Sequence, residues 1–451
     1  MTAPSTNIPV PAADFRPSLY KTDSRTKRRN AAETRFRAYG IAAVAFGVLA
    51  LVVLLTSVLS QGLSAFRQTT MVMQVELDPA VLDKTGNRDP AELGKVTTIT
   101  YGRLLDEALN KELAGKGLIP EGMSARDVSA MISKEAPAQL RKIVLADPSK
   151  IGSTISFDAW TGGRIDGFFK GRVTMESAQL DSNVTPEQLQ LAQAMRDAGL
   201  ITMPFNWAFI TGPDASEVRP EAAGLGVAIL GSAYMMLIVL ALALPIGVAA
   251  SIYLEEFASK NWFTDLIEVN IANLAAVPSI VFGILGLAVF INFAGMPQSS
   301  PLVGGLVLTL MTLPTIIIST RAALKAVPPS IKDAALGVGA SKTQTIFHHV
   351  LPLAMPGILT GTIIGLAQAL GETAPLLLIG MVAFVRDYPG APPEGFLDPA
   401  SALPVQVYNF TQRADPAFVE RASGAIIVLL VFLLAMNILA VILRRKFERR
   451  W

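Results

Sequence analysis

The stretch that decides the fold is residues 333–352, which reads DAALGVGASKTQTIFHHVLP. It is a polar interruption between two long apolar runs, residues 302–318 and 353–385. Its first half has the pattern of a short amphipathic helix, and Gly337 and Gly339 predict a turn. Pro352 is expected to stop a second short helix. The stretch therefore predicts a rigid elbow whose small residues let a partner approach closely.

The chain on both sides of this elbow is too apolar for an ordinary soluble protein. Of its 451 residues, 51% are apolar and only 16% are charged, against about 25% charged in soluble domains. A bilayer core about 30 Å thick requires about 20 apolar residues in a helix. We therefore expect an α-helical polytopic membrane protein with six transmembrane helices, at residues 39–59, 224–254, 266–293, 302–318, 353–385 and 422–443.

The distribution of basic residues predicts the orientation of the chain. Lys and Arg gather in both terminal segments and in the loop that holds the elbow, residues 321–352, whereas the turn at residues 295–300 has none. Short loops rich in Lys and Arg stay in the cytoplasm. The first apolar run lacks a small-residue cleavage site and is expected to be an uncleaved anchor. With six spans, both termini and the elbow are therefore expected in the cytoplasm.

Residues 64–218 lie between the first two spans and are expected to form an α+β insert on the outer side, long enough for a domain. Helical patterns cover residues 101–113, 125–145 and 186–198; alternation predicts strands at 70–77 and 96–101; and 161–171 is expected to be a loop. The insert shows no catalytic constellation, because its carboxylates occupy the positions of solvated helix faces. We expect a docking or structural role for it.

The remaining segments complete the expected organisation of the chain. Residues 1–38 are polar and basic, and we expect a disordered tail near anionic lipid. Within the outer loop 386–421, residues 403–408 are expected to form a short re-entrant or interfacial segment. The expected parts are a cytoplasmic tail (1–38), a first transmembrane helix (39–63), the insert (64–218), a core with the other five helices (219–444) and a basic tail (445–451).

Several kinds of chemistry are excluded. There is no cysteine, and the two histidines are adjacent, His348 and His349, which leaves little room for a metal site or a catalytic triad. A P-loop requires Gly directly before its Lys, but Ser341 precedes Lys342. Neither HExxH nor GxSxG occurs, and a net charge of +2 does not favour nucleic acid as a partner. We expect a chain that is not an enzyme and holds no cofactor or metal.

Glu372 is the clearest ionisable residue inside an apolar run, and such a residue is a functional candidate by default. Gly371 and Pro375 bracket it, so we expect the helix to break there. A broken helix frees backbone N–H groups that can meet an anion. The alternative is that Glu372 pairs with a neighbouring helix and fixes the packing. A carboxylate repels an oxyanion, so direct contact between the two is not expected without a cation.

A second polar group lies in the third apolar run, at Asn270, Asn273 and Ser279, beside Pro278. Asn side chains commonly form hydrogen bonds between membrane helices, and a position along a translocation path is the alternative. Thr309, Thr312 and Thr315 in the fourth run share one helix face. Their hydroxyls either line a path or bond back to the preceding turn.

Residues 333–352 resemble the EAA motif of ABC importer permeases, in which EAA is followed by three residues, Gly, and a stretch that ends in Leu-Pro. Asp333 stands where the family has Glu, and His349 replaces an aliphatic residue. The other motif positions are kept at the expected spacing: Ala334, Ala335, Gly339, Leu351 and Pro352. In the family this loop docks in a cleft of the ATPase subunit, so the resemblance assigns these residues to ATPase coupling.

Three further stretches narrow the resemblance to phosphate permeases. Residues 245–258 and 270–283 are similar to signatures of these permeases, and 371–377 resembles the A-type subunit of the high-affinity phosphate importer. Gln368 stands where many relatives have Arg, so a cationic contact to phosphate is not transferred. The insert 64–218 resembles an extra periplasmic domain that precedes the core in some bacterial versions.

The resemblance implies a permease subunit of an ATP-driven phosphate importer in a bacterial inner membrane, with residues 64–218 in the periplasm. The implied partners are a second, C-type permease chain, an ATPase dimer that binds ATP and Mg²⁺, a periplasmic phosphate-binding protein and the lipid bilayer. Phosphate would cross by alternating access. Our candidates along the pathway are Asn270, Asn273, Pro278, Ser279, Gln368, Gly371, Glu372 and Thr373.

Two other functions remain open from the residues themselves. A permease for another oxyanion, such as molybdate or sulfate, would carry the same elbow. A membrane sensor could use the insert to read a ligand, although sensors usually append a cytoplasmic output domain and this chain has only tails and loops there.

Overall fold

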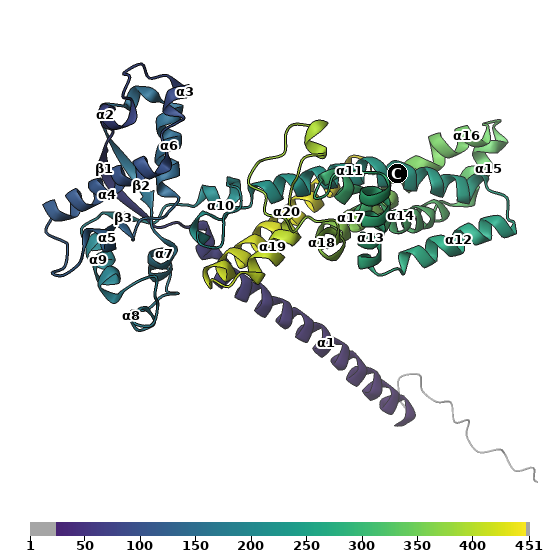
Figure 1. Cartoon of the computed structure of the whole chain (residues 1–451). Helices are drawn as coiled ribbons and strands as arrows, with labels where there is room; N and C mark the ends of the chain where they lie inside the picture. The colour runs from purple at the N-terminus through teal and green to yellow at the C-terminus, as the bar shows by residue number, and fades with distance from the viewer. Residues whose placement is uncertain (1–23, 448–451) are drawn as a thin grey trace, which may run out of the picture. The chain divides into compact units, whose positions relative to one another are not determined.

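The structure is a computed structural model that describes residues 24–447 (Figure 1). Most of the expected N-terminal tail, together with Arg449 and Arg450 of the basic C-terminal tail, lies outside the described residues. Residues up to Ser57 and residues from Val58 onward form two separate compact units. The described part of the first unit belongs to helix α1 (Ser24–Gly62). The expectation of disorder over residues 24–38 was therefore wrong, because this stretch is rich in the good helix formers Arg, Lys, Ala and Glu.

A mixed α and β region follows α1, and we call residues 63–222 the inserted domain. Its three strands are β1 (Thr70–Glu76), β2 (Thr154–Trp160) and β3 (Ile201–Thr202). Its helices are η1 (Leu63–Phe66), α2 (Pro79–Leu82), α3 (Pro90–Leu93), α4 (Thr98–Gly115), α5 (Ala125–Ser129), α6 (Ala136–Ala146), η2 (Pro148–Lys150), α7 (Gly163–Phe169), α8 (Met175–Ala178), α9 (Pro186–Asp197), α10 (Trp207–Thr211) and η3 (Pro220–Ala222).

The sheet of the inserted domain is antiparallel with strand order β2-β1-β3. β1 pairs with β2 from Thr70 opposite Trp160 to Glu76 opposite Thr154. Alternate β1 side chains, at Met71, Met73 and Val75, are buried in a core shared with the apolar face of α4. This period of two is what the sequence alternation predicted for a half-buried strand.

Three local predictions for the inserted domain were wrong. Residues 96–101 are not a strand: Thr97 precedes α4, and Tyr101 begins the apolar stripe that buries this helix. Residues 125–145 hold two helices rather than one, α5 and α6. Residues 161–171 contain α7 rather than a loop, because Ile165 and Gly167 are buried against the rest of the domain. In each case packing decided the structure over local propensity.

The rest of the chain is helical. Its elements are α11 (Gly226–Ile252), η4 (Tyr253–Phe257), α12 (Trp262–Ala275), α13 (Ser279–Leu285), η5 (Gly286–Phe293), α14 (Pro301–Lys325), α15 (Pro329–Gly337), α16 (Lys342–Gln344), η6 (Thr345–Val350), α17 (Leu351–Gly371), α18 (Ala374–Leu378), η7 (Glu394–Phe396), α19 (Leu403–Gln412) and α20 (Ala417–Phe447). The segments η4, η5 and η6 are π-helical.

Within residues 24–447, five helices are long and apolar enough to cross a membrane, or six if one bent pair counts as a span. The bent pair is α12 followed by α13 with η5, and its two parts meet at 105°. The third apolar run is therefore broken rather than straight. Pro278 explains the break, because proline lacks an N–H and disfavours helical geometry in the residue before it.

The fifth apolar run also differs from its prediction. One helix runs from Lys342 to Gly371, with α16, η6 and α17 as its parts. Pro352 therefore does not stop a helix, because it lies in the first turn after the π-helical segment η6, where the hydrogen-bond pattern already changes. After Gly371 the chain forms the short helix α18 and then turns, so residues 353–385 are not one continuous helix.

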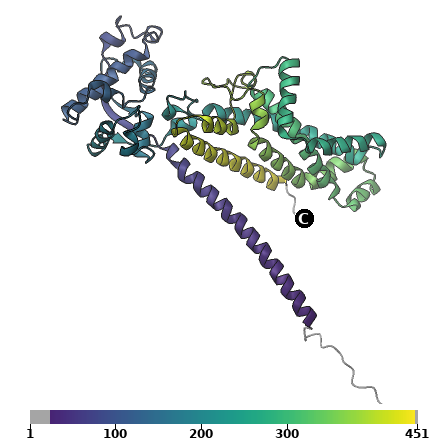
Figure 2. The ribbon, with the colours of Figure 1, turned by 60° about the horizontal axis from the view of Figure 1, so that its bottom comes forward.

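The helical core is a bundle in which α14 packs against α11, α12 and α17, and α20 packs along α17 and α19. Figure 2 shows α19 and α20 side by side in yellow. Small residues permit the close approach: a Cβ on Gly247 would meet Ile316, and one on Gly361 would meet Ser319. Such small-residue contacts are typical of helices that pack inside lipid.

Candidate coupling and translocation sites

The elbow is a hairpin of α15 and the helix that starts at α16. Gly339 has φ +93°, a conformation that residues with a Cβ rarely adopt. The Ala340 N–H donates to the Ala335 carbonyl at 3.1 Å and closes the turn. Ser341 caps the next helix in a reciprocal pair with Gln344. The predicted turn at Gly339 is confirmed, and it gives the elbow one defined shape.

The two sides of the elbow have different surroundings. Ala335, Ile346 and Val350 are buried, the last two in a core with Leu324 and Ile358 of α14 and α17. Three other apolar side chains of the elbow are exposed: Leu336, Val338 and Phe347, at 48%, 87% and 50%. Among the motif residues Asp333, Ala334 and Gly339 are exposed, and Leu351 and Pro352 are half-buried. Three exposed apolar side chains on a rigid hairpin form a surface suited to a protein partner.

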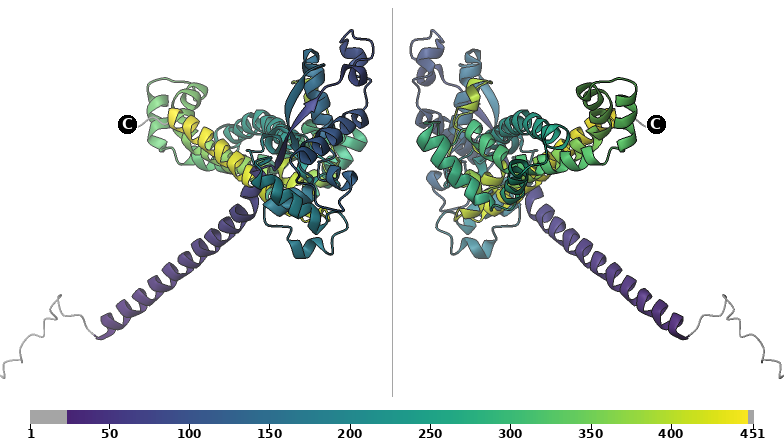
Figure 3. Two further views of the ribbon diagram at one scale, coloured as in Figure 1. Left: turned by 90° about the vertical axis from the view of Figure 1, so that its left-hand side faces the viewer. Right: turned by 90° about the vertical axis from the view of Figure 1, so that its right-hand side faces the viewer.

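Ion pairs hold the base of the elbow to the end of α11. Lys332 lies 2.5 Å from Glu256, and the Lys342 ammonium lies 5.2 Å from the ring centre of Phe257. Glu256 and Phe257 belong to η4, and π-helical segments often mark functional sites. Both arms of the hairpin are therefore fastened to the same turn. Figures 1 and 3 show the elbow, in green, at one end of the helical part.

A second set of ion pairs continues from the elbow to α12. Arg321 of α14 lies 2.7 Å from Glu268 of α12 and 3.3 Å from Glu255 of η4. These pairs join α14, the helix before the elbow, to η4 and to α12. Sequence reasoning missed these two pairs, because their partners lie 53 and 66 residues apart. The signal in the sequence was the adjacent acids Glu255 and Glu256 at the end of an apolar run.

The candidate pathway residues fall on two neighbouring helix breaks. Pro278 and Ser279 begin α13, while Gly371, Glu372 and Thr373 separate α17 from α18. The break predicted at Glu372 is confirmed, since this residue has an extended backbone, with φ −79° and ψ 125°.

The two helices that start at these breaks pack against each other. A Cβ on Gly283 of α13 would lie 2.6 Å from the Cα of Pro375 in α18. The structure therefore brings the two candidate segments onto adjacent helices.

The other polar candidates are not gathered at this point. Asn270, Asn273 and Gln368 are exposed, and the Asn270 amide donates to the Leu266 carbonyl of its own helix at 2.7 Å. Thr309 and Thr312 are buried and bond back to the carbonyls of Gly305 and Leu308. For these two threonines, the local alternative is the one observed.

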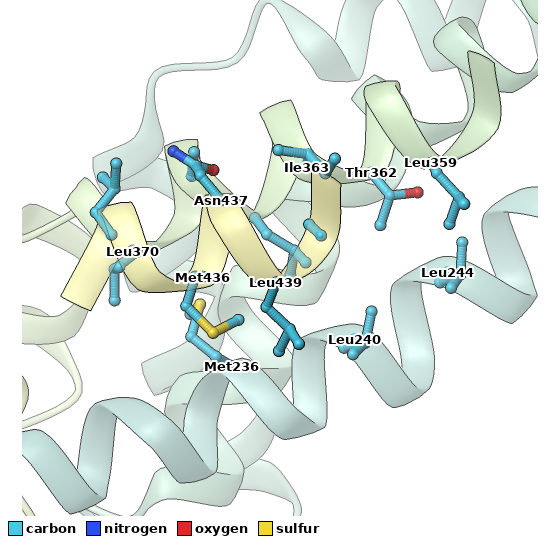
Figure 4. Close-up of a pocket in the computed structure, with 14 residues that line it drawn as sticks. Met236, Leu240, Leu244, Leu359, Thr362, Ile363, Leu370, Met436, Asn437 and Leu439 are labelled. Carbon is cyan, nitrogen blue, oxygen red and sulfur yellow. The ribbon is translucent and has the colours of Figure 1, made fainter. Parts of the chain in front are cut away.

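A cavity of about 200 Å³ lies among α11, α17 and α20 (Figure 4). Leu240, Ile363 and Leu439 are among its apolar lining residues, and Thr362 and Asn437 are the polar ones. None of the candidate pathway residues lines it. An anion would lose its hydration there without compensating donors, so this cavity is unsuited to phosphate.

A buried cluster of charges connects the inserted domain to α20. Lys170 lies 2.8 Å from Asp166 and 2.9 Å from Glu420, and Arg172 lies 2.6 Å from Glu420. The Asp166, Lys170 and Glu420 side chains are each 2% exposed. Arg421 donates to the carbonyls of Ala65 and Glu221 and to Gln68. The first residues of α20 are therefore bound to the inserted domain through buried charges and hydrogen bonds.

Two carboxyl groups of the inserted domain have pKa values shifted in opposite directions, one lowered by the charges of the cluster and one raised by burial. Burial by itself would raise the pKa of Asp166, but the charges of Lys170 and Arg421 and a bond from the Thr69 N–H outweigh it, and the pKa is lowered. Burial raises the pKa of Glu221, which accepts a 2.5 Å hydrogen bond from Ser133. Among residues 24–447, no group of three or more His, Asp or Glu side chains is arranged to hold a metal ion.

Comparisons with known proteins divide the chain into two parts. Residues 243–451 match the family described as "Binding-protein-dependent transport system inner membrane component", and residues 23–179 match "Domain of unknown function (DUF3333)". In solved structures, the chain aligns with the MetNI methionine ABC transporter at 14% identity and TM-score 0.37, over 50% of this chain and 95% of that one. It also aligns with a bacterial alginate ABC transporter at 15% identity and TM-score 0.38, over 49% and 79%.

Curated relatives match over the helical part. The probable ABC transporter permease protein YqgI of Bacillus subtilis is 32% identical, over 49% of this chain and 78% of the relative. The phosphate transport system permease protein PstA 2 of Mycobacterium bovis is 31% identical, over 55% and 79%. PstA of Yersinia pestis is 30% identical, over 50% and 75%. The chain therefore belongs to the ABC importer permeases, as a PstA-type phosphate permease homologue with an extra N-terminal DUF3333 domain.

Proposed function

We propose that this chain is one permease subunit of an ATP-driven phosphate importer. The permease family supports transport, and the names of the PstA relatives support phosphate as the cargo. By the same resemblance, a C-type permease chain completes the pathway, an ATPase dimer binds ATP and Mg²⁺, and a periplasmic binding protein delivers phosphate. The chain lies in a bacterial inner membrane, with both termini in the cytoplasm and residues 64–218 in the periplasm, as the basic loops predict.

The observation that carries the coupling role is the fastening of the exposed elbow to η4. An ATPase subunit that grips Leu336, Val338 and Phe347 would move α15 and α16 together, because Gly339 fixes the hairpin. Lys332–Glu256 and Lys342–Phe257 then transmit the movement to η4, and Arg321 continues it to Glu268 on α12. The chain's own chemistry is therefore mechanical: charged contacts convert movement of the elbow into movement of the path-lining helices.

Within the pathway, the breaks at Pro278 and at Gly371–Thr373 are the places we assign to phosphate. Helix starts present unpaired N–H groups and the positive end of the helix dipole, which favour an anion. Glu372 would repel the anion directly, so we assign it to packing or to the exit side of the break. Alternating access would open the adjacent α13 and α18 to one side at a time.

Phosphate uptake into proteoliposomes tests this proposal. The chain is co-purified with its ATPase and second permease partners, and uptake is measured with the binding protein and ATP. We expect ATP-dependent phosphate uptake that disappears when residues 333–352 are deleted, while assembly of the two permease chains persists. Uptake that survives this deletion would overturn the coupling role. In a competition assay, excess molybdate or sulfate is added to labelled phosphate. If either anion suppresses the uptake of phosphate, that anion is favoured as the cargo instead.

A further inference from the structure

An exposed aromatic surface lies where the inserted domain meets the helices, and we call Leu63, Phe66, Phe205 and Trp207 the aromatic patch. Trp207 is 67% exposed, Leu63 56% and Phe205 48%. The rings form a chain, with Phe66 and Phe205 centres 6.1 Å apart and Phe205 and Trp207 centres 4.8 Å apart. Large apolar side chains that gather at this exposure mark an interaction surface.

The position of the patch along the chain gives its depth relative to a bilayer. The first apolar run ends at residue 59, inside helix α1, and Leu63 follows four residues later. At about 1.5 Å per residue, Leu63 lies about 6 Å beyond the end of the apolar run. The interfacial layer on each side of the hydrocarbon core is about 5–8 Å thick. Leu63 therefore falls within that layer.

Two other apolar helices meet the chain at the same level. The N–H of Leu225, directly before α11, donates to the Phe209 carbonyl at 2.8 Å. Gly424 of α20 contacts Ala65 and the Phe209 ring, and Gly62 contacts Ser423. The end of one apolar helix, the start of a second and the first turns of a third therefore meet beside the patch, whose Phe66 ring packs edge-on against Phe209.

The chemistry of the patch fits this layer. Trp side chains gather at both faces of a bilayer, where the apolar ring enters lipid while its N–H edge meets headgroups. Phe and Leu side chains beside them bury into the boundary between headgroups and acyl chains. Beside the patch, an open groove of about 490 Å³ is lined by Phe66, Phe205, Met203 and the exposed Arg67. An arginine next to aromatic rings adds attraction for lipid phosphate.

We propose that the aromatic patch inserts into the headgroup and acyl boundary of the membrane and anchors the inserted domain to the lipid surface. The occupant is lipid, because three membrane helices fix the patch at that level. The anchor gives the inserted domain a second attachment, independent of the buried charges between Asp166 and Glu420. The proposal does not depend on the cargo or on which face of the membrane carries the domain.

Tryptophan fluorescence of the full chain in liposomes provides the test. Trp160, Trp262 and Trp451 are replaced by Phe, which leaves Trp207 as the single reporter. We expect lipids brominated at the upper acyl carbons to quench the fluorescence of Trp207. We expect aqueous iodide to quench Trp207 at least about twofold less than it quenches a Trp placed at Val81. Val81 is 38% exposed and lies in α2, beyond the end of β1 at Glu76. That end is about 20 Å along the strand from Thr70.

Because the sequence has no cysteine, a spin label provides an independent measurement in case the Trp variants fail to fold. A label at Trp207→Cys should be more accessible to oxygen, which partitions into lipid, than to a polar nickel chelate. A label at Val81→Cys should show the reverse. Quenching of Trp207 by iodide but not by brominated lipid would overturn the proposal. Protection of Trp207 from both quenchers would also overturn it, since a protein partner would then cover the patch.

Discussion

Lys170 of the inserted domain lies 2.9 Å from Glu420, a residue 250 positions later in the first turn of α20. Asp166 and Arg172 complete a compact cluster of two cations and two carboxylates. Because the cluster is buried, it fixes the inserted domain to the start of the last membrane helix, and any tilt of α20 would move both. The inserted domain is thus held to the start of α20 by buried charges.

This contact predicts that Glu420→Gln destabilises the protein. The substitution leaves the buried Lys170 and the half-buried Arg172 with a single carboxylate between them. Breaking a buried pair in this way costs about 3–5 kcal/mol. The thermal unfolding midpoint in detergent should fall clearly. Asp147→Asn is the matched control, because Asp147 and Lys150 form an exposed pair 3.8 Å apart, and it should leave the midpoint unchanged. Equal midpoints for the two variants would show that the cluster does not hold the domain.

Glu221 predicts a stability that depends on pH. Its pKa in the folded state is raised by burial, above an unfolded value of about 4.3. The folded state therefore favours the protonated form, and this contribution is fully present below the unfolded pKa and is lost as pH rises through the folded pKa. Glu221→Gln should remove that loss, so the variant should gain in unfolding midpoint relative to the natural protein as pH rises towards neutrality.

Asp166 serves as the comparison of opposite sign. Because the pKa of Asp166 is lowered in the folded state, its ionised carboxylate contributes stability at pH values above the unfolded-state pKa. That contribution is lost as pH falls through the folded-state pKa. Asp166→Asn should therefore be most destabilising at neutral pH, where Glu221→Gln is most favourable. Midpoints measured across a pH series should show the two variants diverging from the natural protein in opposite directions. Parallel curves would contradict both assignments.

The ion pair between Lys332 of the elbow and Glu256 of η4, here called the brace, predicts that its loss impairs the coupling of ATP hydrolysis to transport. Lys332→Met removes a 2.5 Å contact with Glu256, and a charge-assisted bond in such a partly buried place is worth about 1.5–3 kcal/mol. ATP-driven phosphate uptake should fall about tenfold, with ATP hydrolysis much less affected. Lys325→Met is the control, since Lys325 is 59% exposed and 3.5 Å from Glu255. Restored uptake in a variant that exchanges Lys332 and Glu256 would support the brace, and equal loss of uptake and hydrolysis would contradict it.

The exposed side of the elbow predicts the contact to the ATPase. Phe347 is 50% exposed, and Leu336 and Val338 of the same hairpin are exposed too. Truncation of an aromatic residue at the centre of an interface typically costs about 2 kcal/mol or more. Phe347→Ala should weaken co-purification of the ATPase about tenfold or more while leaving the permease folded. Phe293→Ala, at a residue that is 89% exposed on η5, should leave ATPase binding unchanged. A normal ATPase complex with Phe347→Ala would place the contact elsewhere.

Much of the architecture could be predicted because it depends on local patterns. The apolar runs located the long helices, alternation located β1, and the glycines of residues 337–339 located the elbow turn. The break at Glu372 followed from its flanking Gly and Pro.

The missed features depend on contacts between distant residues. Glu256 meets Lys332 across 76 positions and Glu420 meets Lys170 across 250, and a single sequence gives no pairing of such residues. The angle at Pro278 was missed for a related reason. Proline predicts a break, but the packing of neighbouring helices sets the angle.

The contact between α13 and α18 gives the sharpest test of the two candidate breaks. A Cβ on Gly283 would lie 2.6 Å from the Cα and 2.9 Å from the carbonyl oxygen of Pro375. Both are backbone atoms and cannot turn away, so Gly283→Ala forces the two helices apart and costs about 1–3 kcal/mol. Gly371 has no atom within 4 Å of its Cβ position, so Gly371→Ala is the matched control. We expect Gly283→Ala to lower both the unfolding midpoint and phosphate uptake, whereas Gly371→Ala keeps the midpoint. If Gly283→Ala retained normal uptake, the pathway would not require close packing of the helices that begin at Ser279 and Ala374.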